Sequence, residues 1–425
     1  MVTIAVVFVI TLIIGIPIAF VIGLTGMAHI ASLGNIAYFD VFIQKLISGV
    51  NSNSYLCIPL FVLAGNIMNR GGITERLLNF LRQCIGWIRG GMAYAATLIG
   101  VLLSAILGSS NAVASLLCTT VVPELRKDGF DDEFSVSVCA SSGILGPIIP
   151  PGTSMVIMAV MTGASVRSVF YAGILPGLLI GLAFMAVTFV MTRKRKYPKS
   201  IDRFNVKAWA KALVKSIAAM LVPFVIIIGV TMGIFTPSEA GVIAVAIALI
   251  TGFAYRSLKV KDLPSIFVNS IGTSAGILIV VAFGNVLGWT FSMDQIPAKI
   301  AGAVTSVSSN PTVCLFIIMG IMLIVGFFME GYSAMMIFGP VFAAVASAVG
   351  IDLVQYCMLF VIVINIGLLT PPVGMILFVS SNICGIPLTK ISKAIWPFVV
   401  AAVAALILLI VFPKITLLLP SLIVK

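Results

Sequence analysis

The sequence predicts an all-α polytopic membrane protein with broken helices and two re-entrant helical hairpins, arranged as two structural repeats. Three observations predict it. Of the 425 residues, 61% are hydrophobic and only 9% are charged, with a mean hydropathy of +1.23, whereas soluble proteins carry about 25% charged residues. Long apolar stretches recur from one end of the chain to the other. A motif containing a double proline occurs twice.

The apolar stretches are long enough for helices that cross a bilayer, which takes about 20 residues. Clear examples lie at 2–24, 169–192, 266–291 and 394–412. The alternation of a β-barrel is absent, so these spans are predicted to be helical. No basic residue precedes Lys45, so we expect the first stretch to be a retained transmembrane helix and not a cleaved signal peptide.

The net charge of +12 is concentrated in one basic run. Residues 193–196 read RKRK, and basic residues continue to Lys215. Such a run is typical of a cytoplasmic loop. We therefore expect a cytoplasmic linker at 193–216 between a first repeat, 1–192, and a second repeat, 217–425. The expected surroundings are a lipid bilayer, with no nucleic acid partner. Residues 70–89 are predicted to form an amphipathic helix on the membrane surface.

The repeated motif breaks two apolar segments at matching places. Residues 146–152 read GPIIPPG, and residues 367–374 read GLLTPPVG. Proline within a helix lacks an N–H group and displaces the carbonyl four residues earlier. Pro150 and Pro371 would therefore free the carbonyls of Gly146 and Gly367. Oxygen atoms exposed in this way at membrane depth suit Na⁺. The alternative is a simple proline kink, satisfied by hydroxyl groups or water.

Each repeat also contains a helical hairpin with a polar tip. The hairpins are predicted at 92–123, with the tip GSSNA at 108–112, and at 312–349, with the tip MEGYS at 329–333. The first tip places hydroxyl and amide groups where a half-helix would begin, and the positive end of a helix attracts carboxylates. Glu330 is an acidic residue in the second tip, and an ionisable residue inside a span indicates function.

Taken in order, these motifs resemble the large membrane subunit of tripartite ATP-independent periplasmic (TRAP) transporters. The similarity rests on GIPIAF at 15–20, GSSNA at 108–112, PEL at 123–125, and the two proline motifs. It implies inverted repeats, an elevator-type mechanism and Na⁺ as the coupling ion, with no cofactor. It implies a multi-pass protein of the bacterial inner membrane. It also implies two partners, a separate small four-helix membrane subunit and a periplasmic substrate-binding protein. The implied substrates are small organic acids, of the sialic acid or C4-dicarboxylate type.

The same resemblance implies the site residues. One Na⁺ site would use residues of the first repeat: Ser109, Ser110, Gly146, Ile149 and Pro151. The other would use residues of the second repeat: Gly331, Ser333, Gly367, Thr370 and Met375. For the organic acid we expect contacts from Ser110, Asn111, Ser154 and Glu330. The second tip does not repeat the Gly-Ser-Ser sequence of the first.

Three other functions share some of these sequence features. A stand-alone Na⁺-coupled carboxylate transporter would work without a binding protein, and a channel would share the freed carbonyls. An intramembrane serine protease would use GYSA at 331–334, but its serine needs an activating base. The chain has one histidine, His29, and nothing pairs it with Ser333, so we predict that the protein is not an enzyme. The absence of a phosphate-binding GxxxxGK[ST] loop argues against an ATPase.

Overall fold

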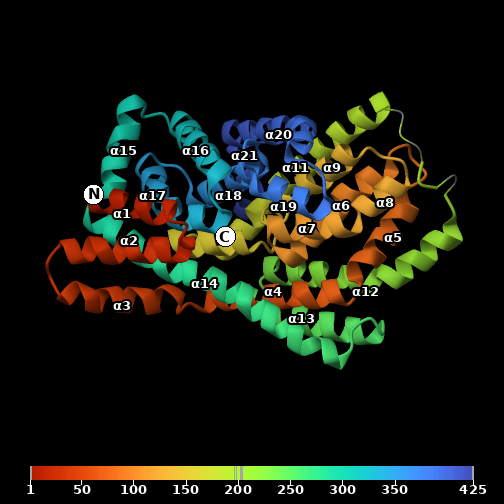
Figure 1. The fold of residues 1–425 in the computed structure, drawn as a ribbon, viewed down its shortest axis with the longest axis horizontal. Helices are drawn as coiled ribbons and strands as arrows, with labels where there is room; N and C mark the ends of the chain where they lie inside the picture. The colour runs from red at the N-terminus through yellow and green to blue at the C-terminus, as the bar shows by residue number, and fades with distance from the viewer. Residues whose placement is uncertain (1, 196, 198, 202–203, 424–425) are drawn as a thin grey trace.

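The computed structural model describes residues 2–195, 197, 199–201 and 204–423, and within this part all regular structure is helical (Figure 1). Of the basic run, Lys196 and Arg203 lie outside the described residues. The first part of the chain forms α1 (Val2–Ile13), α2 (Ile18–Ser32), α3 (Ala37–Val50), η1 (Asn53–Leu56), α4 (Cys57–Arg70), α5 (Ile73–Ile85), α6 (Gly91–Leu107), α7 (Ser110–Thr120), α8 (Val122–Lys127), α9 (Asp132–Gly143), α10 (Thr153–Thr162) and α11 (Val166–Arg195).

The second part follows after the basic run. It forms α12 (Val206–Thr231), α13 (Pro237–Ala254), η2 (Val260–Asp262), α14 (Leu263–Met293), α15 (Ile296–Val307), α16 (Pro311–Phe328), α17 (Gly331–Ala348), α18 (Leu353–Leu369), α19 (Met375–Cys384), α20 (Leu388–Val411) and α21 (Pro413–Ile423). Helices α11 and α12 therefore extend into both ends of the predicted linker.

Several helices have the length and composition of membrane spans. In the described residues, six helices are long and apolar enough to cross a membrane, or up to eight if each of two bent pairs counts as one span. The predicted spans 169–192 and 266–291 lie within α11 and α14, and 394–412 corresponds to α20. The chain is thus a polytopic, all-α membrane protein.

The prediction of one continuous helix over 2–24 is wrong. Helix α1 ends at Ile13, α2 begins at Ile18, and the two helices pack against each other. Gly15 has a φ of +82°, a conformation that glycine adopts readily. Pro17 then precedes the first turn of α2, where its missing N–H group costs nothing.

The amphipathic helix predicted over 70–89 is α5. Its apolar side chains, among them Leu77 and Leu81, are buried where it packs against α6 and α12. On its polar side, Arg82 pairs with Glu124 at 3.0 Å and with Asp128 at 3.1 Å. The amphipathic character is confirmed, whereas its location on a membrane surface stays a prediction.

The helices form two layers that are visible in Figure 1. In the lower layer, the long α14 packs across α2, α3 and α4, and α13 packs on α4 and α12. The upper layer interleaves the two parts of the chain, because α10 packs on α17, α7 on α19, and α9 on α20. The layers meet where α17 packs on α14 and where α6 packs on α4 and α5.

Candidate ion and substrate site

The first hairpin is formed by α6 and α7, which pack against each other. Gly108 ends α6 with a φ of +59°, Ser109 is extended, and α7 begins at Ser110. A Cβ atom at position 108 would lie 3.0 Å from the backbone nitrogen of Thr153. The tip therefore needs glycine both for its left-handed conformation and for its close contact with the start of α10.

The second hairpin is formed by α16 and α17, and its tip is built differently. Helix α16 ends at Phe328, Met329 is extended, and α17 begins at Gly331. Glu330 is the N-cap of α17. Its Oε2 atom accepts hydrogen bonds from the N–H groups of Tyr332 at 2.9 Å and Ser333 at 3.2 Å. Part of the acceptor capacity of this carboxylate is thus used within the tip.

Both double-proline motifs interrupt helices, as predicted. The first break separates α9 from α10 and the second separates α18 from α19, and both Pro–Pro peptide bonds are cis. In the first break, the carbonyls of Gly146 and Pro147 accept no hydrogen bond from the described residues. In the second break, the N–H group of Thr370 donates to the Gly367 carbonyl at 2.9 Å.

The expectation that Gly367 has a freed carbonyl is therefore wrong. A turn closes one residue before the double proline, and Thr370 is the last residue there that still has an N–H group to donate. Leu368 keeps an unpaired carbonyl, as its counterpart Pro147 does, because the residues three and four positions later are Pro371 and Pro372 and neither can donate. Among the described residues, the second break thus retains the unpaired carbonyl that corresponds to Pro147 and lacks the one that corresponds to Gly146.

Each break contacts the hairpin of its own half. A Cβ atom on Gly146 would lie 3.1 Å from the carbonyl oxygen of Ser109, in the first tip. A Cβ atom on Gly367 would lie 2.6 Å from the Cα atom of Gly326, in α16. Larger residues at either glycine would push the hairpin away from the broken helix.

The two tips enclose one small cavity. Its lining combines residues of both halves: Ser109, Ser110, Asn111, Pro147, Ser154, Glu330, Gly331, Tyr332, Asn365 and Leu368. About 10 Å³ is accessible to the centre of a water-sized sphere, which is room for roughly one water molecule or a similar ion. In this conformation the cavity is too small for an organic acid.

Hydrogen bonds across the cavity join the two halves. Ser110 Oγ donates to Asn365 Oδ1 of α18, and Asn365 Nδ2 donates to the Val361 carbonyl at 2.6 Å. The Thr153 hydroxyl lies 3.0 Å from the Gly108 carbonyl and 2.7 Å from the Tyr332 hydroxyl, so it connects both tips with α10.

Two buried polar atoms at the tips have no hydrogen-bond partner among the described residues. They are Asn111 Oδ1 and Ser333 Oγ. A buried polar atom left unpaired costs about 1–3 kcal/mol, and both atoms are acceptors of the kind that hard cations prefer. In the same part of the chain, no group of three His, Cys, Asp or Glu side chains could hold a metal ion. The unpaired atoms at the tips are thus side-chain oxygens, the ligand type of hard cations.

The predicted site residues divide into two groups. Those that line the cavity are Ser109, Ser110, Asn111, Ser154, Glu330 and Gly331. Those that are not among its lining residues, and that lie in the breaks, at the end of α18 or in the first turns of α17 and α19, are Gly146, Ile149, Pro151, Ser333, Gly367, Thr370 and Met375.

Sequence reasoning missed three residues of this site, Thr153, Tyr332 and Asn365. Asn365 could have been found from the sequence, because it is the single amide in the apolar run 356–369. No sequence pattern pointed to Thr153 and Tyr332, because their contact depends on how α10 meets the second tip.

Nearly the whole chain matches a known family. The model described as "Tripartite ATP-independent periplasmic transporter, DctM component" matches residues 5–415. The chain belongs to this TRAP family. It is 37% identical to the uncharacterized protein YgiK of Salmonella typhimurium, over 98% of this chain and 96% of that protein. It is 32% identical to the sialic acid TRAP transporter large permease protein SiaM of Vibrio cholerae, over 96% and 95%.

A third relative has a different substrate in its name. The chain is 33% identical to the C4-dicarboxylate TRAP transporter large permease protein DctM of Pseudomonas aeruginosa, over 89% and 88% of the two chains. Among solved structures, the Alcanivorax borkumensis YdaH transporter superposes with a TM-score of 0.66 at 13% identity, over 89% and 88%. That likeness shows a shared transporter fold. The protein is accordingly a large permease subunit of the TRAP family and not an enzyme.

Proposed function

We propose that this TRAP subunit imports an organic acid anion, of the sialic acid or C4-dicarboxylate type, by secondary transport coupled to Na⁺. A periplasmic binding protein would deliver the anion, and a separate small four-helix subunit would complete the complex in the bacterial inner membrane. The observation that carries the proposal is that both hairpin tips and the first break meet at one small cavity, which both halves line.

We propose Na⁺ as the coupling ion because the breaks and tips contain oxygen atoms that have no hydrogen-bond partner among the described residues. Within this part of the chain, the carbonyls of Gly146, Pro147 and Leu368 accept no hydrogen bond, and the hydroxyl of Ser333 is buried without a partner of hydrogen-bonding geometry. Unwound carbonyls together with half-helix ends form Na⁺ sites in transporters. A bound ion would offset the cost of these unpaired atoms and would fix the tips against the breaks.

The carboxylate of the substrate would bind at α7 and not at α17. Both helices begin at the cavity, and the N-terminus of a helix attracts anions. Glu330 already caps α17 with a carboxylate, whereas no side chain caps α7 and its first turn contains no acidic residue. Ser110 and Asn111 would add their side-chain donors there, and Ser154 lines the same cavity.

The mechanism we propose is an elevator motion of the upper layer against the lower one. The cavity has no room for an organic acid, so the tips would have to separate before the acid can bind. The hairpins belong to the upper layer, which meets the lower layer along α14 and around α6. Relative movement at these two contacts would carry the cavity across the membrane.

Uptake by the purified protein in liposomes tests the proposal. The small subunit would be reconstituted with the full chain, and candidate acids would be offered with and without an inward Na⁺ gradient and the binding protein. We expect accumulation only when both are present. Na⁺-driven accumulation without the binding protein would favour a stand-alone transporter. Flux that never exceeds the equilibrium distribution of the acid would indicate a channel.

A further inference from the structure

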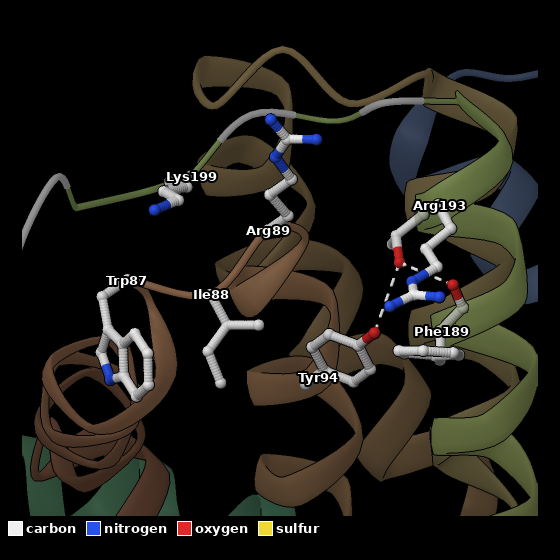
Figure 2. Close-up of a pocket in the computed structure, with 8 residues that line it drawn as sticks. Trp87, Ile88, Arg89, Tyr94, Phe189, Arg193 and Lys199 are labelled. Carbon is white, nitrogen blue, oxygen red and sulfur yellow. Dashed lines mark hydrogen bonds between the residues drawn. The ribbon is translucent and has the colours of Figure 1, made fainter.

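A second, larger pocket shares no lining residue with the cavity at the hairpin tips. It has a volume of about 700 Å³ and lies between the corner joining α5 to α6 and the end of α11 (Figure 2). Its lining contains three cationic residues and an aromatic or apolar group: Trp87, Ile88, Arg89, Tyr94, Phe189, Thr192, Arg193 and Lys199. The proposed transport mechanism makes no use of this pocket.

The positive charge of the pocket is not neutralised by the described part of the protein. None of Arg89, Arg193 and Lys199 forms an ion pair with a described residue. The Arg193 guanidinium instead lies over the Phe189 ring, 4.5 Å from its centroid, as Figure 2 shows. Three cations that share one pocket without a carboxylate favour an anionic ligand.

The acidic side chains on the neighbouring helices have other partners. Asp128 accepts hydrogen bonds from Ser200 and from Arg82. Asp131 accepts from Tyr197 and from Arg195, and these hydrogen bonds hold the pKa of Asp131 below its usual value. Both carboxylates are therefore engaged outside the pocket.

The apolar side chains of the pocket are typical of a membrane boundary. Trp87, Ile88 and Phe189 are 43%, 39% and 46% exposed, which is unfavourable in water. The apolar helix α11 ends here in a basic last turn, and tryptophan is enriched where hydrocarbon meets the headgroups. A ligand that matches both features has a phosphate group and hydrocarbon chains.

We propose that this pocket binds the headgroup of an anionic phospholipid, with the phosphate between Arg89, Arg193 and Lys199 and the acyl chains along Phe189 and Ile88. Thr192 donates its hydroxyl hydrogen to the Phe189 carbonyl at 3.1 Å. The Tyr94 hydroxyl, 3.3 Å from that of Thr192, would turn to donate to a phosphate or glycerol oxygen of the lipid. Basic pockets between membrane helices are known to suit such headgroups.

The location gives the lipid a mechanical role. The chain passes from one layer to the other twice, at the corner 86–90 between α5 and α6 and again in the segment after α11. These two connections are hydrogen-bonded to each other, because Ser200 and Ile201 donate their N–H groups to the Gly86 carbonyl at 3.0 and 3.1 Å. Gly90 packs tightly on Thr192, since a Cβ atom there would lie 2.5 Å from Thr192 Cγ2. A phosphate that contacts both connections would hold them together while the layers move.

Native mass spectrometry of the purified full chain tests this site. The protein would be delipidated and titrated with phosphatidylglycerol, cardiolipin or phosphatidylcholine of equal chain length. We expect the two anionic lipids to bind at least ten-fold more tightly than phosphatidylcholine. Each of Arg89→Gln, Arg193→Gln and Lys199→Gln should weaken binding of the anionic lipids about five-fold. Phe189→Ser should weaken the binding of all three lipids, because it removes a contact to the acyl chains.

The matched control is Lys207→Gln with Lys211→Gln. These residues belong to the same basic run but do not line the pocket, so lipid binding should be unchanged. Thermal unfolding of each variant in detergent separates loss of the site from loss of the fold. Equal losses in pocket and control variants would overturn the proposal, as would wild-type protein without preference for anionic lipid. Displacement of the lipid by millimolar inorganic phosphate would identify a site for soluble phosphate and would also overturn it.

Discussion

Ser110, at the tip of the first hairpin, donates its hydroxyl hydrogen to Asn365, in the α18 helix of the second half. The two residues are 255 positions apart in the chain. Asn365 in turn donates to the Val361 carbonyl, so both ends of its amide are engaged and its orientation is fixed. The first tip is therefore held by a helix that ends at the second break, and the two halves share one site.

Removing the Ser110 hydroxyl should weaken Na⁺ activation more than folding. Ser110→Ala leaves Asn365 Oδ1 buried without a donor, at a cost of about 1–3 kcal/mol. This loss destabilises the conformation in which the first tip contacts Asn365, which is the one that would bind Na⁺. The Na⁺ concentration for half-maximal uptake should therefore rise about ten-fold or more. Ser115→Ala, on the same helix α7, is the control. An unchanged Na⁺ requirement in Ser110→Ala would mean that this hydroxyl has no part in ion binding.

The charge of Glu330 can be separated from its capping role. Glu330→Gln keeps an oxygen that can accept from Tyr332 and Ser333, whereas Glu330→Ala removes the cap, at a cost of about 1 kcal/mol. If the negative charge helps to hold Na⁺, Glu330→Gln should fold normally and need more Na⁺ for uptake. Thermal unfolding and uptake against Na⁺ concentration measure the two effects. Normal Na⁺ activation in Glu330→Gln would show that Glu330 only caps α17 and that its charge has no part in Na⁺ binding.

The Tyr332 hydroxyl should affect the closure of the site and little else. Tyr332→Phe removes the contact with Thr153 and leaves the hydrogen bond between Thr153 and the Gly108 carbonyl intact. We expect a loss of about 1 kcal/mol in the closed conformation, seen as an approximately five-fold higher KM for the acid. The transport rate at saturating acid should fall less. A variant with wild-type KM would show that the two tips close independently of this contact.

Repairing the first break should reduce transport. Pro150→Ala supplies an N–H group within reach of the unpaired Gly146 carbonyl, and a helical hydrogen bond there would remove an oxygen from the proposed ion site. Uptake and its Na⁺ dependence are the measurements. Pro176→Ala is the control, because Pro176 lies inside the continuous helix α11 and should not affect the Na⁺ requirement. Wild-type uptake by Pro150→Ala would reduce the break to a structural bend.

The architecture of the site was predictable because its signals are local. Double prolines at matching positions interrupt helices wherever they occur, and Gly108 marks the tip by its own conformation. The separation of α1 from α2 was missed, although Gly15 and Pro17 stand in the sequence, because hydropathy alone does not register a break between two apolar segments.

The contacts between the halves could not be predicted. The sequence indicated one ion site in each half, whereas the cavity is lined by both halves. The interaction of Ser110 with Asn365 depends on how α7 is placed against α18, and no spacing in the sequence encodes that distance. The hydrogen bond from Thr370 to Gly367 was likewise hidden, since it depends on a turn that closes just before the double proline.

Equilibrium binding of radioactive sodium to the purified full chain, with potassium as the competing salt, tests the central claim most directly. The account predicts saturable sodium binding that potassium does not displace. Sodium binding should be weaker in Ser110→Ala, which removes a hydroxyl from the first hairpin, and in Ser333→Ala, which removes one from the second. Ser115→Ala should leave sodium binding unchanged. No saturable binding by a folded protein, or equal binding by all three variants and the wild type, would contradict the account.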